Sequence, residues 1–341
     1  MLYASKKASI DFLDSPRIVY LPRKYIDPLS PNTCRFVSLL PGGADDPVEL
    51  WLLDEQLESV PTGYEALSYY WGNPAHTAKI AVDNAGELGV TDNLHAALRL
   101  LSFPDQVRAL WIDALCIDQS NPKERSAQVR RMGDIYRTAV CVLVWLGEDQ
   151  IVKNSEVCVR QFGWPEQIGS MADRIDDLVL RVENTGGEPA QTHAQTLAPR
   201  GPLEMYLANR VCIIQEVALA REITIHCGQF SWSWTSFHRV CESVRKVSGP
   251  FSAFMAFDNW PEKMQRIRSL GSTTETLDLH QFLREFRSSQ ATDSRDKVYG
   301  LLGLTDVSMP VDYELVFFEV QKMQISTHMS LNFLSGWPWP Q

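Results

Sequence analysis

The sequence lacks the short motifs that mark the common metal and cofactor sites. It contains no CxxC pair, no HExxH and no calcium-binding loop, so we expect no metal site. The phosphate loop ending in GKS or GKT, the dinucleotide fingerprint GxGxxG and the nucleophile elbow GxSxG are also missing. We therefore expect no resident cofactor.

Long apolar runs and a cysteine framework are absent as well. No apolar run approaches the ~20 residues of a membrane span, and Met1 to Asp14 contain no long apolar core. We therefore expect neither a membrane helix nor a signal peptide. The seven cysteines are odd in number and scattered, which predicts reduced thiols in a cytoplasmic protein.

An excess of positive charge is missing too. The 341 residues include 42 acidic and 32 basic side chains, for a formal charge of −10. An acidic chain repels phosphate backbones and anionic membranes, which argues against general nucleic-acid binding. Hydrophobic residues make up 45% and charged residues 22%, as in an ordinary globular protein.

The apolar pattern predicts an α/β fold. Two apolar runs, 34–40 and 48–53, flank a turn-rich stretch and indicate an N-terminal β-hairpin. The run 140–146 is apolar throughout, as in a parallel strand buried on both faces. We expect a mostly parallel sheet flanked by helices, with a right-handed crossover. The other predicted strands are 64–70, 79–82, 109–112 and 223–227, and the predicted helices before the insertion are 91–101 and 121–139.

The second half of the chain is predicted to be an insertion followed by mainly helical structure. The insertion covers about 150–205 and includes one candidate helix, 171–182. The helices predicted after it are 207–220, 234–244, 280–286 and 297–304. The predicted domains are a hairpin segment packed on the core (1–62), a central domain (63–245) and a helical C-terminal extension (246–341).

Polar and aromatic side chains follow the predicted parallel strands. Ligands of such sheets bind beyond the carboxyl ends of the strands. Trp71, Asp113 and Gly147 should therefore lie along one edge, in a site suited to a polar, ring-containing ligand. Two of these residues also have a structural interpretation. Trp71 can be a core aromatic, and Asp113 can cap a turn or the next helix. The candidate binding residues at these strand ends are Ser68, Tyr69, Trp71, Gly72, Asp113 and Cys116.

A second polar group surrounds the predicted helix start at Pro122. Asn121 is a suitable N-cap, and Glu124 stands three residues later, where a capping-box partner is expected. Arg125 and Gln128 lie one helical turn apart and can fold back toward the acidic loop before the helix. We expect a mainly structural network formed by Asp113, Asp118, Gln119, Glu124, Arg125 and Gln128.

Glu216 and the pair Cys116 and His226 allow competing interpretations. Glu216 lies in the middle of a predicted helix, where a surface glutamate is the ordinary interpretation. Cys116 and His226 could serve as a nucleophile and its base, but nothing in the sequence brings them together.

Several blocks of the sequence resemble the signature of the fungal heterokaryon incompatibility (HET) domain. Residues 64–72 (YEALSYYWG), 111–119 (WIDALCIDQ) and 124–147 are similar to its three main blocks. Residues 210–216 (RVCIIQE) resemble a fourth block, and 294–304 (SRDKVYGLLGL) resemble a downstream segment. Two positions depart from the family pattern: Cys212 stands where Trp is usual, and Asp118 where Asn is common.

The resemblance implies a fold similar to that of TIR domains and a role in cell death or defence. In TIR enzymes a Ser or Cys is followed one helical turn later by the glutamate that cleaves NAD+, and Cys212 and Glu216 match this spacing. Glu216 is thereby implied as the catalytic residue, with NAD+ or a related nucleotide as substrate and with Arg210 and Cys212 added to the nucleotide-binding set. A single ionised carboxylate suffices, since nicotinamide leaves as a neutral molecule.

Two other functions stay open on the same resemblance. One is a non-enzymatic signalling module that self-associates through TIR-like surfaces and recruits an incompatibility partner. The other is a degenerate domain with only a binding role. Glu216 beside Cys212 favours the enzyme, whereas the long insertion favours the degenerate domain.

Overall fold

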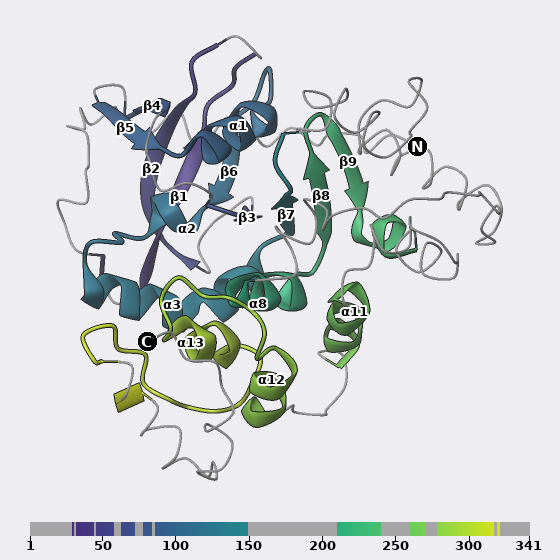
Figure 1. The fold of residues 1–341 in the computed structure, drawn as a ribbon. Helices are drawn as coiled ribbons and strands as arrows, with labels where there is room; N and C mark the ends of the chain where they lie inside the picture. Colours follow the sequence, from purple (N-terminus) through teal and green to yellow (C-terminus); the bar gives the residue numbers. More distant parts are fainter. Residues whose placement is uncertain are drawn as a thin grey trace, which may run out of the picture.

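Figure 1 shows the fold as a computed structural model, which describes residues 29–30, 32–43, 46–57, 63–71, 78–83, 86–148, 210–239, 260–270, 278–316 and 319–320. A single nine-stranded sheet runs through the described part, in the order β5-β4-β2-β1-β6-β3-β7-β8-β9. The strands are β1 (Thr33–Leu39), β2 (Glu49–Gln56), β3 (Glu65–Tyr69), β4 (Ala78–Val82), β5 (Gly86–Val90), β6 (Arg108–Trp111), β7 (Cys141–Trp145), β8 (Ile223–Cys227) and β9 (Phe230–Ser233).

The helices lie between and after these strands. Those of the first half are α1 (Asp92–Leu101), α2 (Asp113–Cys116) and α3 (Pro122–Thr138). Those of the second half are α8 (Val211–Leu219), α11 (Trp260–Leu270), α12 (Leu279–Glu285) and α13 (Asp296–Leu302). The predicted insertion and its candidate helix 171–182 lie outside the described residues, as does the predicted domain boundary at 245/246.

The sheet is mixed, which corrects the expectation of a mostly parallel one. Its central strands β6, β3, β7 and β8 are mutually parallel, as predicted. The strands around them pair mainly antiparallel, in β1–β2, β1–β6, β4–β5 and β8–β9. Three of these pairs join strands that follow one another in the chain, because short connections produce antiparallel hairpins.

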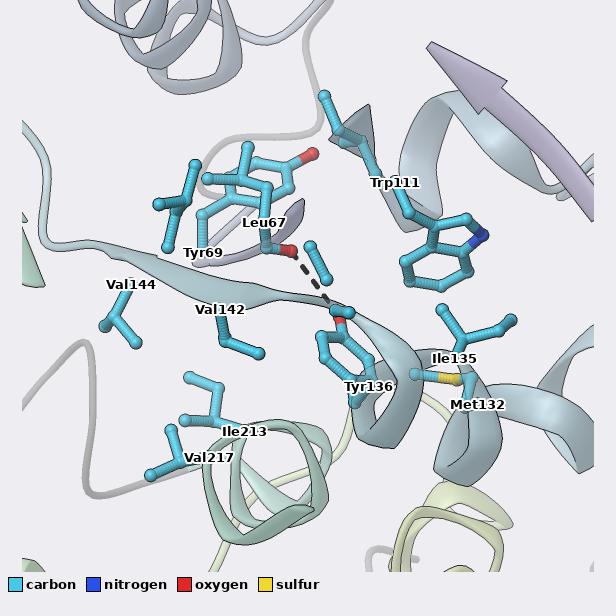
Figure 2. Packing of buried hydrophobic residues seen from close by; sticks show 14 of the residues in the cluster. Leu67, Tyr69, Trp111, Met132, Ile135, Tyr136, Val142, Val144, Ile213 and Val217 are labelled. Carbon is cyan, nitrogen blue, oxygen red and sulfur yellow. Dashed lines mark hydrogen bonds between the residues drawn. The ribbon is translucent and has the colours of Figure 1, made fainter. Parts of the chain in front are cut away.

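Helices α3 and α8 cover one face of the central strands. Figure 2 shows Tyr136 of α3 and Ile213 and Val217 of α8 packed toward Val142 and Val144 of β7. Side chains alternate between the faces of a strand, so Trp145 points to the other face. There its indole Nε1 donates to Asn93 Oδ1 of α1 at 2.9 Å. The central strands are therefore buried on both sides.

Helix α13 lies against α3 and α8, in the lower part of Figure 1. The contact is close because glycines meet there: a Cβ atom on Gly133 would stand 3.0 Å from the Cα atom of Gly303. A Cβ atom on Gly303 would stand 2.6 Å from Gln215 Oε1, which accepts the Gly303 N–H at 2.9 Å. Gln215 thus joins α13 to the central layer.

Within the described ranges, no helix has both the length and the apolar character needed to cross a membrane.

Candidate functional site

The carboxyl ends of the parallel strands bring Trp71 and Asp113 together. Strands β6, β3 and β7 run side by side in the same direction, so Trp71, Asp113 and Gly147 follow them at one edge of the sheet. The Trp71 indole Nε1 donates to both carboxylate oxygens of Asp113, at 3.2 and 3.1 Å. The expected arrangement at this edge is confirmed. Gly72 lies outside the described residues.

Glu216 lies on the buried side of α8 and is only 3% exposed. Its Oε2 atom makes no hydrogen bond to any described residue. Burial, and next the charge of Asp113, raise the pKa of Glu216 to about 8. The hydroxyls of Ser68 and Tyr136 and the Arg210 cation act in the opposite direction. The surface-glutamate interpretation is therefore wrong.

Ser68 and Tyr136 approach Glu216 from β3 and α3. Both are close enough to lower the pKa of Glu216, yet Ser68 Oγ has no hydrogen bond of normal geometry within the described structure. Tyr136 is fully buried, and its single O–H proton can go either to the Glu216 carboxylate or to Leu67 O, which lies 3.4 Å from the hydroxyl oxygen. The carboxylate is thus surrounded by polar groups that leave part of its hydrogen-bonding capacity unused.

Asp113 is the second carboxylate of the site. Part of its surface is accessible, but enough protein surrounds it that burial raises its pKa to about 6. Hydrogen bonds from Ala114 N–H, at 2.7 Å, and from Trp71, together with the charge of Arg210, moderate this rise. Two carboxyl groups with raised pKa values in one site are typical of functional sites rather than of surface structure.

Arg210 supplies the positive charge near these two groups. It is the N-cap residue of α8, and its guanidinium carbon lies 4.7 Å from the centre of the Tyr70 ring. Its Nη2 atom donates to Thr292 Oγ1 at 3.2 Å. Its positive charge partly offsets the effect of burial, which raises the pKa values of Asp113, Glu216 and Cys212. The sequence-based assignment of Arg210 to this site is consistent with its position.

The remaining predicted binding residues are less accessible. Burial raises the pKa values of Tyr69 and of both thiols, Cys116 and Cys212, above their usual range. Cys116 is 1% exposed, and its sulfur accepts the Ile112 N–H at 3.3 Å, which makes it a core residue. It cannot pair with His226 as nucleophile and base, since β3 and β7 separate β6 from β8.

The predicted structural network around Pro122 forms only in part. Asn121 caps α3 as expected, and Gln119 Nε2 donates to Asp113 O at 3.0 Å. Glu124 is not a capping-box partner of Asn121. Its Oε1 instead accepts from Asp118 N and from the buried Arg35, at 2.8 and 2.9 Å. The buried guanidinium attracts the carboxylate more strongly than a helix-end N–H does.

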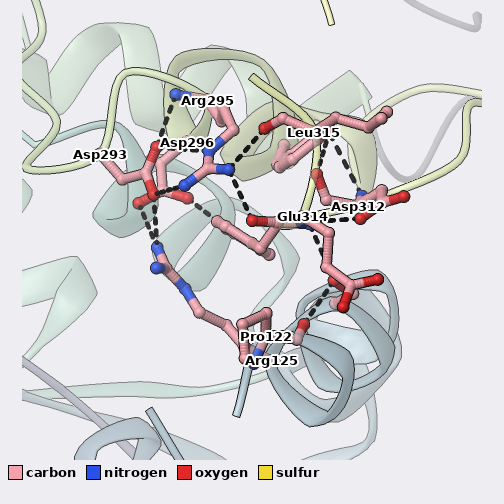
Figure 3. Close-up of polar contacts among 11 residues, drawn as sticks. Pro122, Arg125, Asp293, Arg295, Asp296, Asp312, Glu314 and Leu315 are labelled. Atoms are coloured by element: carbon pink, nitrogen blue, oxygen red, sulfur yellow. Dashed lines mark hydrogen bonds and ion pairs between the residues drawn. The ribbon is translucent and has the colours of Figure 1, made fainter. Parts of the chain in front are cut away.

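Arg125 and Gln128 were expected to join the same network, and this expectation is wrong. Gln128 Nε2 donates to Thr33 O at 3.0 Å. Arg125 points toward the C-terminal extension, where it pairs with Asp293 and Asp296 at 3.3 Å each (Figure 3). Burial inside the packed helices, together with two carboxylates, favours that direction over the exposed loop.

Three residues of the site were not singled out in the sequence: Tyr136, Thr292 and Asn93. Tyr136 lies on the apolar stripe of α3, and the sequence pattern therefore indicates an ordinary core aromatic. Thr292 lies 82 residues after Arg210, so no local pattern connects the two. Asn93 Nδ2 donates to Tyr70 O at 2.5 Å, and its position at the start of α1 resembles that of an ordinary helix-end residue.

The fold and the site together define an α/β domain with two carboxyl groups at the carboxyl edge of its parallel strands. Residues 64–216 match the family model described as "Heterokaryon incompatibility protein (HET)". The chain therefore carries a HET domain, and Glu216 is the last residue of the match.

One curated relative is "Heterokaryon incompatibility protein 6, OR allele" of Neurospora crassa, 42% identical over 101 residues. The alignment covers 26% of this chain and 15% of the relative, so the chain spans only a small part of that protein's length. No solved structure matches the chain.

Proposed function

We propose that this HET domain is an effector of heterokaryon incompatibility and that it cleaves NAD+ or a related nucleotide at Glu216. The relative's printed name and the HET match support the first part. The second part also draws on the resemblance to TIR enzymes. The observation that carries it is the buried Glu216 carboxyl, whose Oε2 has no hydrogen-bond partner among the described residues and which feels the charges of Asp113 and Arg210.

The proposed reaction breaks the bond between the nicotinamide nitrogen and C1′ of the ribose. The electron pair goes to the ring nitrogen, so a cationic ring leaves as neutral nicotinamide and no general acid is required. Positive charge develops on the ribose and is stabilised by an ionised carboxylate. Water then adds to C1′ and releases a proton, which gives the ribosyl product.

The proposed chemistry requires an ionised Glu216, although the raised pKa of this residue favours the neutral form. At neutral pH the free protein holds most Glu216 side chains in the protonated, neutral form. A cationic nicotinamide ring placed beside the carboxyl lowers its pKa, because opposite charges favour the ionised state. The substrate thereby helps to generate the form that stabilises the transition state, and activity increases with pH.

The groups around the carboxyls suit the rest of such a ligand. Trp71 is a half-buried aromatic at the strand end, and its ring suits contact with a base or a nicotinamide ring. The Arg210 guanidinium uses one N–H for Thr292, and its other donors can bind phosphate oxygens. We therefore assign Arg210 to the phosphates and Glu216 to the ribose.

The test measures cell killing and NAD+ content together in an expression host. Wild-type protein should kill cells and deplete NAD+, and Glu216→Gln should do neither at equal protein level. The matched control is Glu222→Gln, which changes an exposed glutamate six residues later and should behave as wild type. If Glu216→Gln kills cells without NAD+ loss, the domain is a non-enzymatic signalling module and the catalytic proposal is wrong.

A further inference from the structure

The residues from 289 to 316 lie beyond the HET match, yet they contact Arg210 directly. Arg210 and Gln290 form an isolated parallel β-bridge, and Val211 N–H donates to Gln290 O at 3.1 Å. Two residues later, Thr292 Oγ1 accepts from Arg210 Nη2 at 3.2 Å. This segment therefore holds both the backbone and the guanidinium of Arg210.

A cluster of charged groups anchors the same segment to α3. Arg125 pairs with Asp293 and Asp296, and its guanidinium carbon lies 3.7 Å from the centre of the Tyr313 ring. Arg295 binds Asp293 and donates to the carbonyls of Tyr313 and Leu315, at 2.7 Å each (Figure 3). Asp293 is thus bound by two arginines immediately after Thr292.

We propose that residues 289–316 complete the site of the HET domain, because they position Arg210 on Tyr70 beside the two carboxyl groups. Thr292 and the Gln290 backbone are then positioning groups, and Arg125 acts on the site through the segment that it anchors. The proposal concerns the site described under the proposed function, but it is a statement about geometry and charge. It holds whether or not the bound nucleotide is NAD+.

The consequence is a change in how Glu216 ionises. The groups that act on its carboxyl are Asp113 after β6, Ser68 on β3, Tyr136 on α3 and Arg210 at the start of α8. Arg210 is the cation among them and favours the ionised form. When its guanidinium is released from Thr292 and Tyr70, less positive charge faces Glu216. The pKa of Glu216 then rises further, and a smaller fraction is ionised at neutral pH.

The experiment is a ¹³C NMR titration of the full chain labelled at glutamate carboxyl carbons, with Glu216→Gln used to assign the Glu216 signal. Arg210→Met should move the midpoint up by about one pH unit, the size expected for loss of a nearby opposite charge. Thr292→Val and Arg125→Met should move it in the same direction by part of that amount. Arg130→Met is the matched control.

The control is close because Arg130 also lies on α3 and donates to the same segment, but it does so from an exposed position and only to Val311 O, at 3.3 Å, 19 residues after Thr292. Its replacement removes the same charge but touches neither Thr292 nor Asp293, so the Glu216 midpoint should stay at the wild-type value. Circular dichroism and thermal melts show that each variant is folded. If Arg125→Met fails to fold, Thr292→Val alone decides the result.

The proposal is overturned if Thr292→Val titrates like wild type, or if Arg130→Met moves the midpoint as far as Arg125→Met does. It is also overturned if Arg210→Met leaves the midpoint unchanged. Nicotinamide release from NAD+ is measured in parallel. A wild-type chain that releases none contradicts the proposed function, while the titration still decides whether the segment positions Arg210.

Discussion

Replacement of Glu216 by glutamine should stabilise the folded protein, and the gain should grow with pH. The buried carboxyl has its pKa raised from 4.5 to about 8, so between these values the folded state holds a proton that the unfolded chain has released. For an acid whose pKa is raised on folding, stability is full below pH 4.5 and declines as pH increases toward 8. Glutamine does not titrate and removes this decline.

The magnitude follows from the displacement of the pKa. At pH 7 the pH is 2.5 units above the ordinary glutamate pKa of 4.5 and still below the raised value of about 8, and each unit is worth about 1.4 kcal/mol, so the loss is about 3 kcal/mol. The same relation gives about 1 kcal/mol at pH 5 and about 4 kcal/mol at pH 8. The difference in unfolding free energy between Glu216→Gln and wild type should therefore widen by about 3 kcal/mol between pH 5 and pH 8.

Urea unfolding followed by tryptophan fluorescence at pH 5, 6, 7 and 8 measures this difference. Thr305→Val is the control, since it removes a hydroxyl that donates to Leu302 O and changes no titratable group. Its difference from wild type should be the same at each pH. A Glu216→Gln difference that is also constant with pH would refute the raised pKa and the electrostatic description of the site.

Three further results are expected. If Glu216 acts as an ionised group, kcat/KM for nicotinamide release should rise about tenfold from pH 7 to pH 9, and a flat or falling profile would contradict that role. Arg125→Met should lower the unfolding free energy by about 1–2 kcal/mol, because it breaks two partly buried ion pairs and a cation–π contact. Lys79→Met breaks only the exposed pair with Glu87 and should leave the melting temperature unchanged; equal effects would count against the anchoring cluster. Gly303→Ala should cost about 1–3 kcal/mol because its Cβ atom meets Gln215, whereas Gly42→Ala, with neighbours at 3.5 Å, should be tolerated.

Much of the central sheet could be predicted from the sequence. Strands β3, β6, β7 and β8 coincide closely with apolar runs, and burial on both faces makes such runs easy to recognise. The outer elements carry weaker signals. Strand β5 (GELGV) contains two glycines, β9 (FSWS) is short and half polar, and α11 (WPEKMQRIRSL) is mostly polar. Their structure depends on neighbours that local periodicity does not report, so none of the three was predicted.

Some contacts of the candidate site could likewise be predicted from the sequence, and others could not. The Trp71–Asp113 contact follows from parallel strand ends, so strand prediction alone places the two residues at one edge. Glu216 was assigned through a family resemblance, because its local pattern is that of a surface residue. The partners of Arg125 could not be predicted, since Asp296 lies 171 residues away and only tertiary packing selects it over the nearby loop acids.

The most direct test of the central claim is nicotinamide release from NAD+ by the purified full chain at pH 8, with wild type and Glu216→Gln compared side by side. Wild type should release nicotinamide, and Glu216→Gln should be slower by about 10²-fold or more, as for loss of a preorganised electrostatic group. Glu222→Gln should match wild type. Equal rates for wild type and Glu216→Gln, or no release by folded wild-type protein, would contradict the assignment of Glu216 as the catalytic residue.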